Sequence, residues 1–186
     1  MNARTWIGCM LLASVVVSSA IVGVARSSAS MQARVGRSRP ACTIVGTDGD
    51  DELHGTPGAD VICGRSGSDF IEARGGADIV FGGSGADLVE TGQGADTLRG
   101  EQGRDILLGE QGRDRAFGGP GQDDVRGGPG RDRIVGNAGS DPCLSATDEH
   151  PGDRVLGGPG FDSADRDDGD RLFAVERITE NVCFGG

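Results

Sequence analysis

A nine-residue repeat constrains this chain more than any other feature. From Gly46 the register holds without a gap to Leu144, which makes eleven consecutive units. Residues 145–147 interrupt the register, a degraded unit covers 148–156, and a last unit, GGPGFDSAD, begins at Gly157. Self-similarity at a fixed period predicts stacked repeats, each burying its apolar face against the next. The 35 glycines among 186 residues therefore indicate repeated turns rather than disorder.

Three positions define the unit. Position four is glycine everywhere except at Pro151 in the degraded unit, which suits a turn that needs positive φ or close backbone approach. Position six is aspartate in all thirteen units. Position eight is apolar throughout and predicts one inward-facing side chain per short strand. The position-eight residues are Leu53, Ile62, Ile71, Val80, Val89, Leu98, Leu107, Ala116, Val125, Ile134, Cys143, Val155 and Ala164.

This pattern resembles the RTX, or haemolysin-type, calcium-binding repeat, whose consensus is GGxGxDxUx with U apolar. The resemblance covers Gly46 to about Asp165. It implies an all-β chain that folds as a right-handed parallel β-roll, a solenoid with terminal caps. In that family two units make one turn, so units one apart lie in opposite sheets and units two apart stack.

The resemblance also implies that multiple Ca²⁺ ions lie between stacked turns, held by position-six carboxylates and loop carbonyls. Calcium takes six to eight oxygen ligands, so two stacked loops are needed to complete one shell. Asp is also a common turn former beside Gly, which explains a few of these residues but not thirteen in phase. The predicted ligands are Asp51, Asp60, Asp69, Asp78, Asp87, Asp96, Asp105, Asp114, Asp123, Asp132, Asp141, Asp153 and Asp162.

The chain is expected to fold only when calcium is bound. One inward aliphatic side chain per nine residues gives a thin core, and stacked strands bring aspartates of like charge close together. The calcium-free chain is therefore expected to be largely disordered, with folding coupled to binding.

The chain divides into four expected segments. Residues 1–25, with Arg4 before a long apolar stretch, have the pattern of a secretory signal peptide, which predicts a secreted or cell-surface protein. An uncleaved membrane anchor is the alternative. A flexible leader (26–41), the β-roll (42–165) and a C-terminal cap (166–186) follow. The cap loses the repeat aspartate but keeps apolar residues such as Leu172 and Ile178.

Four cysteines remain after the signal peptide, and an even number in an exported chain favours disulfides. A Cys42–Cys63 bridge would fix the N-terminal end of the roll, and Cys143–Cys183 would tie down the C-terminal cap. The other two pairings stay open.

Other functional classes have less support. A net charge of -11 disfavours nucleic acid as a partner, and the chain has neither HExxH nor GxSxG and only two histidines, so we do not expect an enzyme. Position seven should face outward, and Phe70, Leu88 and Ile106 would form one exposed apolar column. A calcium-dependent adhesive or partner-binding module at the cell surface is therefore the alternative function, although strand propensity also explains such residues. A monomer is expected.

Overall fold

The computed structural model describes residues 39–146, 152–165 and 169–178, and within them all regular structure is β-strand. The expected signal peptide and nearly all of the leader lie outside these residues. In the part of the chain that the structure describes, no helix is long and apolar enough to cross a membrane.

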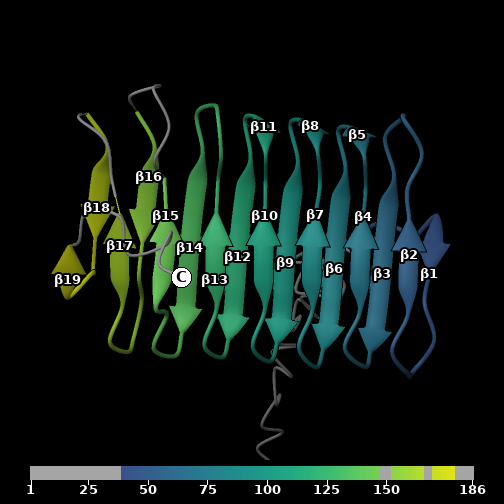
Figure 1. Cartoon of the computed structure of the whole chain (residues 1–186), viewed down its shortest axis with the longest axis horizontal. Coiled ribbons are helices and arrows are strands. Elements are labelled where there is room, and N and C mark those ends of the chain that lie inside the picture. Colours follow the sequence, from purple (N-terminus) through teal and green to yellow (C-terminus); the bar gives the residue numbers. More distant parts are fainter. Residues whose placement is uncertain (1–38, 147–151, 166–168, 179–186) are drawn as a thin grey trace, which may run out of the picture. The chain divides into compact units, whose positions relative to one another are not determined.

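The described residues form two long parallel sheets that face each other, with successive strands alternating between them (Figure 1). The first sheet has eight strands in an order that follows the chain. These strands are β1 (Ile44–Val45), β3 (Val61–Ser66), β6 (Ile79–Ser84), β9 (Thr97–Gln102), β12 (Arg115–Pro120), β14 (Arg133–Ala138), β16 (Arg154–Leu156) and β18 (Arg171–Phe173).

The second sheet contains the intervening strands, also eight in number among the described residues. They are β2 (Glu52–His54), β4 (Phe70–Glu72), β7 (Leu88–Glu90), β10 (Ile106–Leu108), β13 (Asp124–Arg126), β15 (Cys143–Ser145), β17 (Ser163–Asp165) and β19 (Arg177–Ile178). A short third sheet joins the loops of three stacked units through β5 (Gly75–Gly76), β8 (Gln93–Gly94) and β11 (Gln111–Gly112).

The register shows that the repeat is the structural unit. Ile62 pairs with Val80 in the first sheet, and Ile71 pairs with Val89 in the second. Each partner lies two units further along the chain, while the unit between them belongs to the opposite sheet. The expected parallel β-roll is therefore confirmed.

The core is a single file of small and medium aliphatic side chains between the two sheets. Position-eight residues such as Leu98 and Leu107 have no exposed surface, and Ile44 and Leu53 pack against the N-terminal end of the file. Neighbouring residues at positions seven and nine point out of the roll, because side chains alternate along a strand. The core is therefore only one side chain thick.

One expected core residue is wrong. Val125 pairs with Leu144 rather than with Cys143, and Leu144 is the member of the core cluster. Pro142 follows Asp141 and adds one residue between the aspartate and the inward position of that unit. Since a shift of one residue exchanges the two faces of a strand, Cys143 leaves the core file.

The sheets extend beyond the last recognisable repeat. β18 pairs with β16, and β19 pairs with β17, which places Leu172 beside Val155 and Ile178 beside Ala164. The segment expected to form a cap thus contributes one more strand to each sheet.

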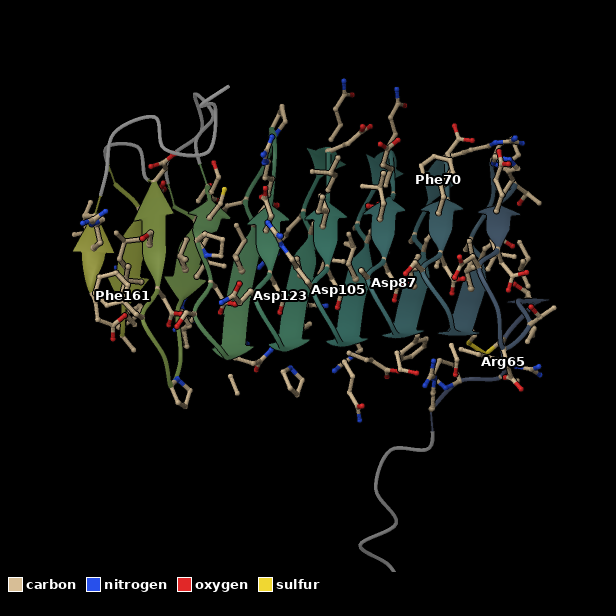
Figure 2. The ribbon with its side chains drawn as sticks, turned by 60° about the horizontal axis from the view of Figure 1, so that its bottom comes forward. Arg65, Phe70, Asp87, Asp105, Asp123 and Phe161 are labelled. Carbon is tan, nitrogen blue, oxygen red and sulfur yellow. A yellow bond between two sulfur atoms is a disulfide. The ribbon has the colours of Figure 1, made fainter. Side chains whose placement is uncertain are left out.

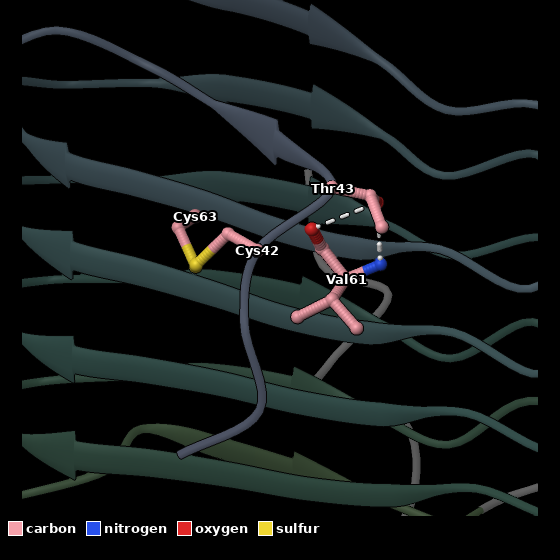
Figure 3. Close-up of a disulfide and its surroundings, with 4 residues drawn as sticks. All are labelled: Cys42, Thr43, Val61 and Cys63. Carbon is pink, nitrogen blue, oxygen red and sulfur yellow. Dashed lines mark hydrogen bonds between the residues drawn. A yellow bond between two sulfur atoms is a disulfide. The ribbon is translucent and has the colours of Figure 1, made fainter.

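A disulfide joins Cys42 to Cys63 at the N-terminal end of the roll, as expected (Figure 3). Beside it, the Thr43 hydroxyl donates to the Val61 carbonyl oxygen at 3.1 Å and accepts the Val61 N–H at 3.0 Å. The first strand is therefore fixed both covalently and by hydrogen bonds. Cys143 is also disulfide-bonded, but Cys183, its expected partner, lies outside the described residues.

The single-file core gives two adjacent residues opposite sensitivities. Leu107 is completely buried, whereas Ile106 beside it is 41% exposed. Leu107→Ala should lower the free energy of unfolding by about 2–5 kcal/mol, because it leaves a cavity. Ile106→Ala should change it by about 0.5 kcal/mol or less. Urea denaturation at saturating calcium measures both, and equal losses would contradict the arrangement of the core.

Candidate metal centre

The loops that connect the sheets are held in left-handed backbone conformations. At position four, Gly67 has φ of +113°, and a Cβ there would lie 2.6 Å from the Gly49 carbonyl oxygen of the preceding turn. The expected need for glycine at this position is confirmed. From the third unit on, position two also has positive φ in the described residues, even where it is Arg65 (Figure 2) or Asn137, whereas Thr47 and Thr56 do not have it.

The position-six aspartates form two columns, one along each row of loops. In each column the backbone N–H of one aspartate donates to Oδ1 of the aspartate one turn further on. Asp87 donates to Asp105, and Asp105 donates to Asp123, each at 3.0 Å (Figure 2). The first column contains Asp51, Asp69, Asp87, Asp105, Asp123, Asp141 and Asp162, and the second contains Asp60, Asp78, Asp96, Asp114, Asp132 and Asp153.

All thirteen predicted aspartates thus take a place in one of these columns. Asp141, which precedes a proline, and Asp153, in the degraded unit, keep the same bond pattern as the others. The interruption lengthens the separation of paired aspartates from 18 to 21 residues at Asp132–Asp153 and Asp141–Asp162. The inserted residues therefore leave the columns intact.

The second carboxylate oxygen is the unusual feature of these columns. In most of the aspartates Oδ2 is buried and accepts no hydrogen bond from the described residues. A buried oxygen without a hydrogen-bond donor lowers the free energy of unfolding, and the loss is larger when the oxygen carries a charge. The residues concerned include Asp69, Asp78, Asp87, Asp96, Asp105, Asp114, Asp123, Asp141 and Asp162.

Glycine at position one leaves a space beside most of these oxygens, whereas Ala73 and Thr91 take that position in the units of Asp78 and Asp96. A Cβ on Gly109 would lie 2.9 Å from Asp114 Oδ2 and 2.6 Å from the carbonyl oxygen of Gly127 in the next turn. The space is therefore bordered by a carboxylate and by a backbone carbonyl, which are the ligand types of calcium. In the described ranges no three Asp, Glu, His or Cys side chains converge on one point, so carbonyls would have to provide much of any ligand shell. The residues present fit a hard cation bound between loops.

Burial controls the ionisation of these carboxyl groups. Removal from water raises the pKa of Asp114 and Asp123 to about 7, and of Asp78, Asp105 and Asp141 to about 6. The neighbouring aspartates of the column raise the pKa further, against the lowering effect of the backbone N–H. Without a cation, these carboxyl groups therefore stay protonated to a higher pH than a free aspartate does.

The two N-terminal aspartates differ from the rest. Asp51 Oδ2 accepts the Thr47 N–H at 2.6 Å and the Thr47 hydroxyl at 3.0 Å. Asp60 Oδ2 accepts the Thr56 N–H at 2.7 Å and the Thr56 hydroxyl at 2.8 Å. The Thr56 N–H is the main reason that the pKa of Asp60 is lowered. Threonine at position two thus satisfies the oxygen that is unpaired further along the roll.

Two carboxylates at the C-terminal end were not predicted. Asp170 accepts the Asp153 N–H through Oδ1 at 3.1 Å, and Glu176 accepts the Asp162 N–H through Oε2 at 2.8 Å. They occupy the place of the next aspartate in each column. Their separations from the preceding member, 17 and 14 residues, break the period and hid them from the repeat pattern. An aspartate or glutamate two residues before an apolar residue was the available signal.

Comparison with protein families agrees with this geometry. A family model described as the RTX calcium-binding nonapeptide repeat matches four times, at residues 43–71, 64–89, 81–116 and 117–141. Together the matches span more than half of the chain. The chain belongs to the RTX calcium-binding nonapeptide repeat family. The repeat implies calcium binding, and the aspartates of the RTX roll are the residues that the consensus places in the loops. A search of curated proteins found no match.

The raised pKa values predict how the metal-free RTX roll depends on pH. A carboxyl group whose pKa rises on folding from 3.8 to about 6 or 7 contributes stability at low pH and loses it as pH rises through those values. In calcium-free buffer, strand content should therefore be higher at pH 5.5 than at pH 8. Far-ultraviolet circular dichroism at low protein concentration measures this change.

Calcium provides the control for this experiment. At saturating calcium the direction should reverse, because protons then compete with the cation for the same carboxylates. A calcium-free chain with as much strand at pH 8 as at pH 5.5 would contradict the proposed cost of the buried charges.

Proposed function

We propose that this chain is an exported calcium-binding protein in which Ca²⁺ ions between stacked loops drive the folding of the β-roll. The observation that carries the proposal is the row of buried Oδ2 atoms that accept no hydrogen bond from the described residues. Most of them lie beside a space that a position-one glycine leaves open and that a carbonyl of the next turn borders. A hard divalent cation bound there would compensate both the charge and the missing contacts.

Calcium would act mainly as a folding cofactor. The aliphatic core is one side chain thick, and at neutral pH the columns hold carboxylates of like charge one strand spacing apart, about 4.8 Å. The free energy of ion binding then becomes free energy of folding, because the unfolded chain does not assemble the loops. We propose no catalytic role.

The ligands would not be distributed evenly along the roll. The predicted aspartates from Asp69 to Asp162 are the proposed carboxylate ligands, together with carbonyls of the glycine loops. Asp51 and Asp60 instead have Oδ2 held by threonine. We therefore propose that the first two loops close without an ion of their own.

An extracellular location would suit a protein whose folding depends on calcium. The sequence pattern of residues 1–25 supports export, and the disulfide between Cys42 and Cys63 fits an oxidising compartment. Free calcium outside the cell would then trigger folding after export.

Replacing one ligand should have opposite effects with and without calcium. Asp105→Asn keeps the Oδ1 that accepts the Asp87 N–H but removes the buried charge. Without calcium the variant should show more strand than the wild type at pH 8, whereas with calcium it should need about tenfold more ion to fold. Circular dichroism during a calcium titration measures both effects.

Asp124→Asn is the matched control for Asp105→Asn. Asp124 lies at an outward position and pairs with Arg126 at 3.0 Å, a surface contact of small energetic value. Its titration should follow the wild type. If the wild-type spectrum does not change on chelation, or if Asp105→Asn and Asp124→Asn behave alike, the proposed function is wrong.

A partner-binding role is the second candidate, and one observation favours it. Phe70, Leu88 and Ile106 stack in register on the outer side of the second sheet, where they line a hollow of about 370 Å³. Glu52 and Asp124 continue the same row and limit the apolar column to three residues. An adhesive contact would use this column in the calcium-bound roll.

A charge in the middle of the column tests the second candidate. Leu88→Lys should abolish calcium-dependent attachment of the purified protein to the surface of the producing cells, while Leu88→Val should retain it. At saturating calcium both variants should have the strand content of the wild type, because the Leu88 side chain lies outside the core. Equal attachment of both variants would exclude a role for the column.

A further inference from the structure

The outer side of the first sheet carries a row of arginines in its C-terminal half. Arg115 pairs with Arg133, Arg133 with Arg154, and Arg154 with Arg171, on the adjacent strands β12, β14, β16 and β18 (Figure 1). All four side chains are exposed. One positive charge therefore recurs at each strand spacing, about 4.8 Å.

Two further arginines lie beside this row. Arg113 and Arg131 are exposed at position five of their units, two residues before Arg115 and Arg133. We call the six residues the arginine face: Arg113, Arg115, Arg131, Arg133, Arg154 and Arg171. Like charges stacked in register are unfavourable on a sheet, and within the described residues none of the six forms a salt bridge with a carboxylate. A chain of net charge -11 thus concentrates uncompensated positive charge on one surface.

The arginine face is hollowed. Arg113, Arg115, Arg131, Arg133 and Arg154 line a cavity of about 200 Å³, together with Gly152 and the buried Asp114 and Asp132. A Cβ at Gly152 would lie 2.9 Å from Arg131 Nε, so glycine leaves room for that guanidinium group. Several guanidinium donors therefore border one space large enough for an anionic group.

An apolar row runs alongside the arginines on the same side of the sheet. Phe117, Val135 and Leu156, each at position nine, pair in register, and Phe173 continues the row on β18, so that each lies two residues after an arginine. Phe173 is 45% exposed, and the Arg154 guanidinium lies 5.8 Å from the centre of its ring. The surface thus offers both anion-binding groups and flat apolar groups at the same repeat distance.

We propose that the arginine face binds a linear acidic polysaccharide. The guanidinium fork matches the two oxygens of a carboxylate or a sulfate group, and the apolar row can pack against the faces of sugar rings. A polymer with an acidic group on successive sugars presents regularly spaced charge to the regularly spaced arginines. Duplex nucleic acid and anionic membranes carry charge over a broad surface and would also approach the negatively charged remainder of the roll, whereas a single polysaccharide strand can follow the arginine face alone.

The proposed site rests on the proposed calcium function in two respects. The arginines reach their register only when the strands stack, and cations bound at Asp114 and Asp132 would neutralise the carboxylates beneath the hollow. Polysaccharide binding should therefore require calcium. This dependence separates a site built by the fold from attraction between a disordered arginine-rich chain and any polyanion.

The experiment is a binding titration of the full chain at saturating calcium and moderate salt, in which calorimetry measures the heat of binding. The probes are an oligogalacturonate, a sulfated dextran oligosaccharide, duplex DNA and phosphatidylserine vesicles. The wild type should bind at least one of the two acidic oligosaccharides, more tightly than DNA or vesicles, and should lose binding in chelator. Arg115→Ala with Arg133→Ala should weaken binding by about tenfold or more, because each guanidinium contributes charge-assisted hydrogen bonds.

Two matched variants complete the design. Arg65→Ala with Arg104→Ala removes the same charge away from the arginine face and should bind as the wild type does. Arg115→Lys with Arg133→Lys keeps the charge but removes the forks, and should bind more weakly than the wild type. At saturating calcium every variant should have the strand content of the wild type by circular dichroism, which shows that the roll still folds.

The outcomes separate this proposal from the proposed function. A chain that does not fold with calcium overturns the calcium function. A chain that folds with calcium but binds neither oligosaccharide overturns the polysaccharide site alone. Equal or tighter binding of DNA or vesicles, or equal losses in the Arg115/Arg133 and Arg65/Arg104 alanine variants, would also overturn it.

Discussion

The structure depends on one hydrogen bond that recurs in every turn, between an aspartate N–H and the carboxylate of the aspartate stacked above it. This bond buries a charged group beside each loop and fixes the loops of successive turns at one register. It also uses only one oxygen of the carboxylate, and in aspartates such as Asp87, Asp105 and Asp123 the other oxygen faces the space that a glycine leaves open. The proposed calcium ions would act as the counter-ions of these groups, because the thin aliphatic core cannot offset a row of buried charges.

The aspartate columns lack a hydrogen-bond donor at the N-terminal end and a hydrogen-bond acceptor at the C-terminal end. At the N-terminal end, Asp51 and Asp60 have no earlier aspartate that donates to Oδ1, and the hydroxyl groups of Thr47 and Thr43 donate to these oxygens at 3.2 and 3.3 Å. At the C-terminal end, the N–H groups of Asp153 and Asp162 need an acceptor, which Asp170 and Glu176 provide. The disulfide at Cys42 adds a covalent closure to the first end. Each end is thus completed by side chains that the repeat itself does not contain.

Most of the fold could be predicted because the repeat encodes it locally. The spacing of glycine, aspartate and aliphatic residues fixes which side chains face inward and which units stack, so pairs such as Ile62 and Val80 follow from the period alone. The exceptions arise where the period fails. Pro142 shifts the inward position to Leu144, and irregular spacing conceals Asp170. The partners of Asp51 and Asp60 were also missed, because threonine at position two does not reveal which oxygen its hydroxyl will contact.

The alternation of units between two sheets limits how a roll of this kind can change in length. Gain or loss of 18 residues adds or removes a whole turn and leaves every later strand on its original side. Gain or loss of nine residues would transfer every later unit to the opposite sheet, and the surface rows that depend on vertical register would be divided between two sides. The three residues inserted after Leu144 leave this parity unchanged, because β16 still follows β14 in the first sheet and β17 still follows β15 in the second. Duplication in pairs is therefore the route by which such a chain could lengthen while its outer surfaces keep their chemistry.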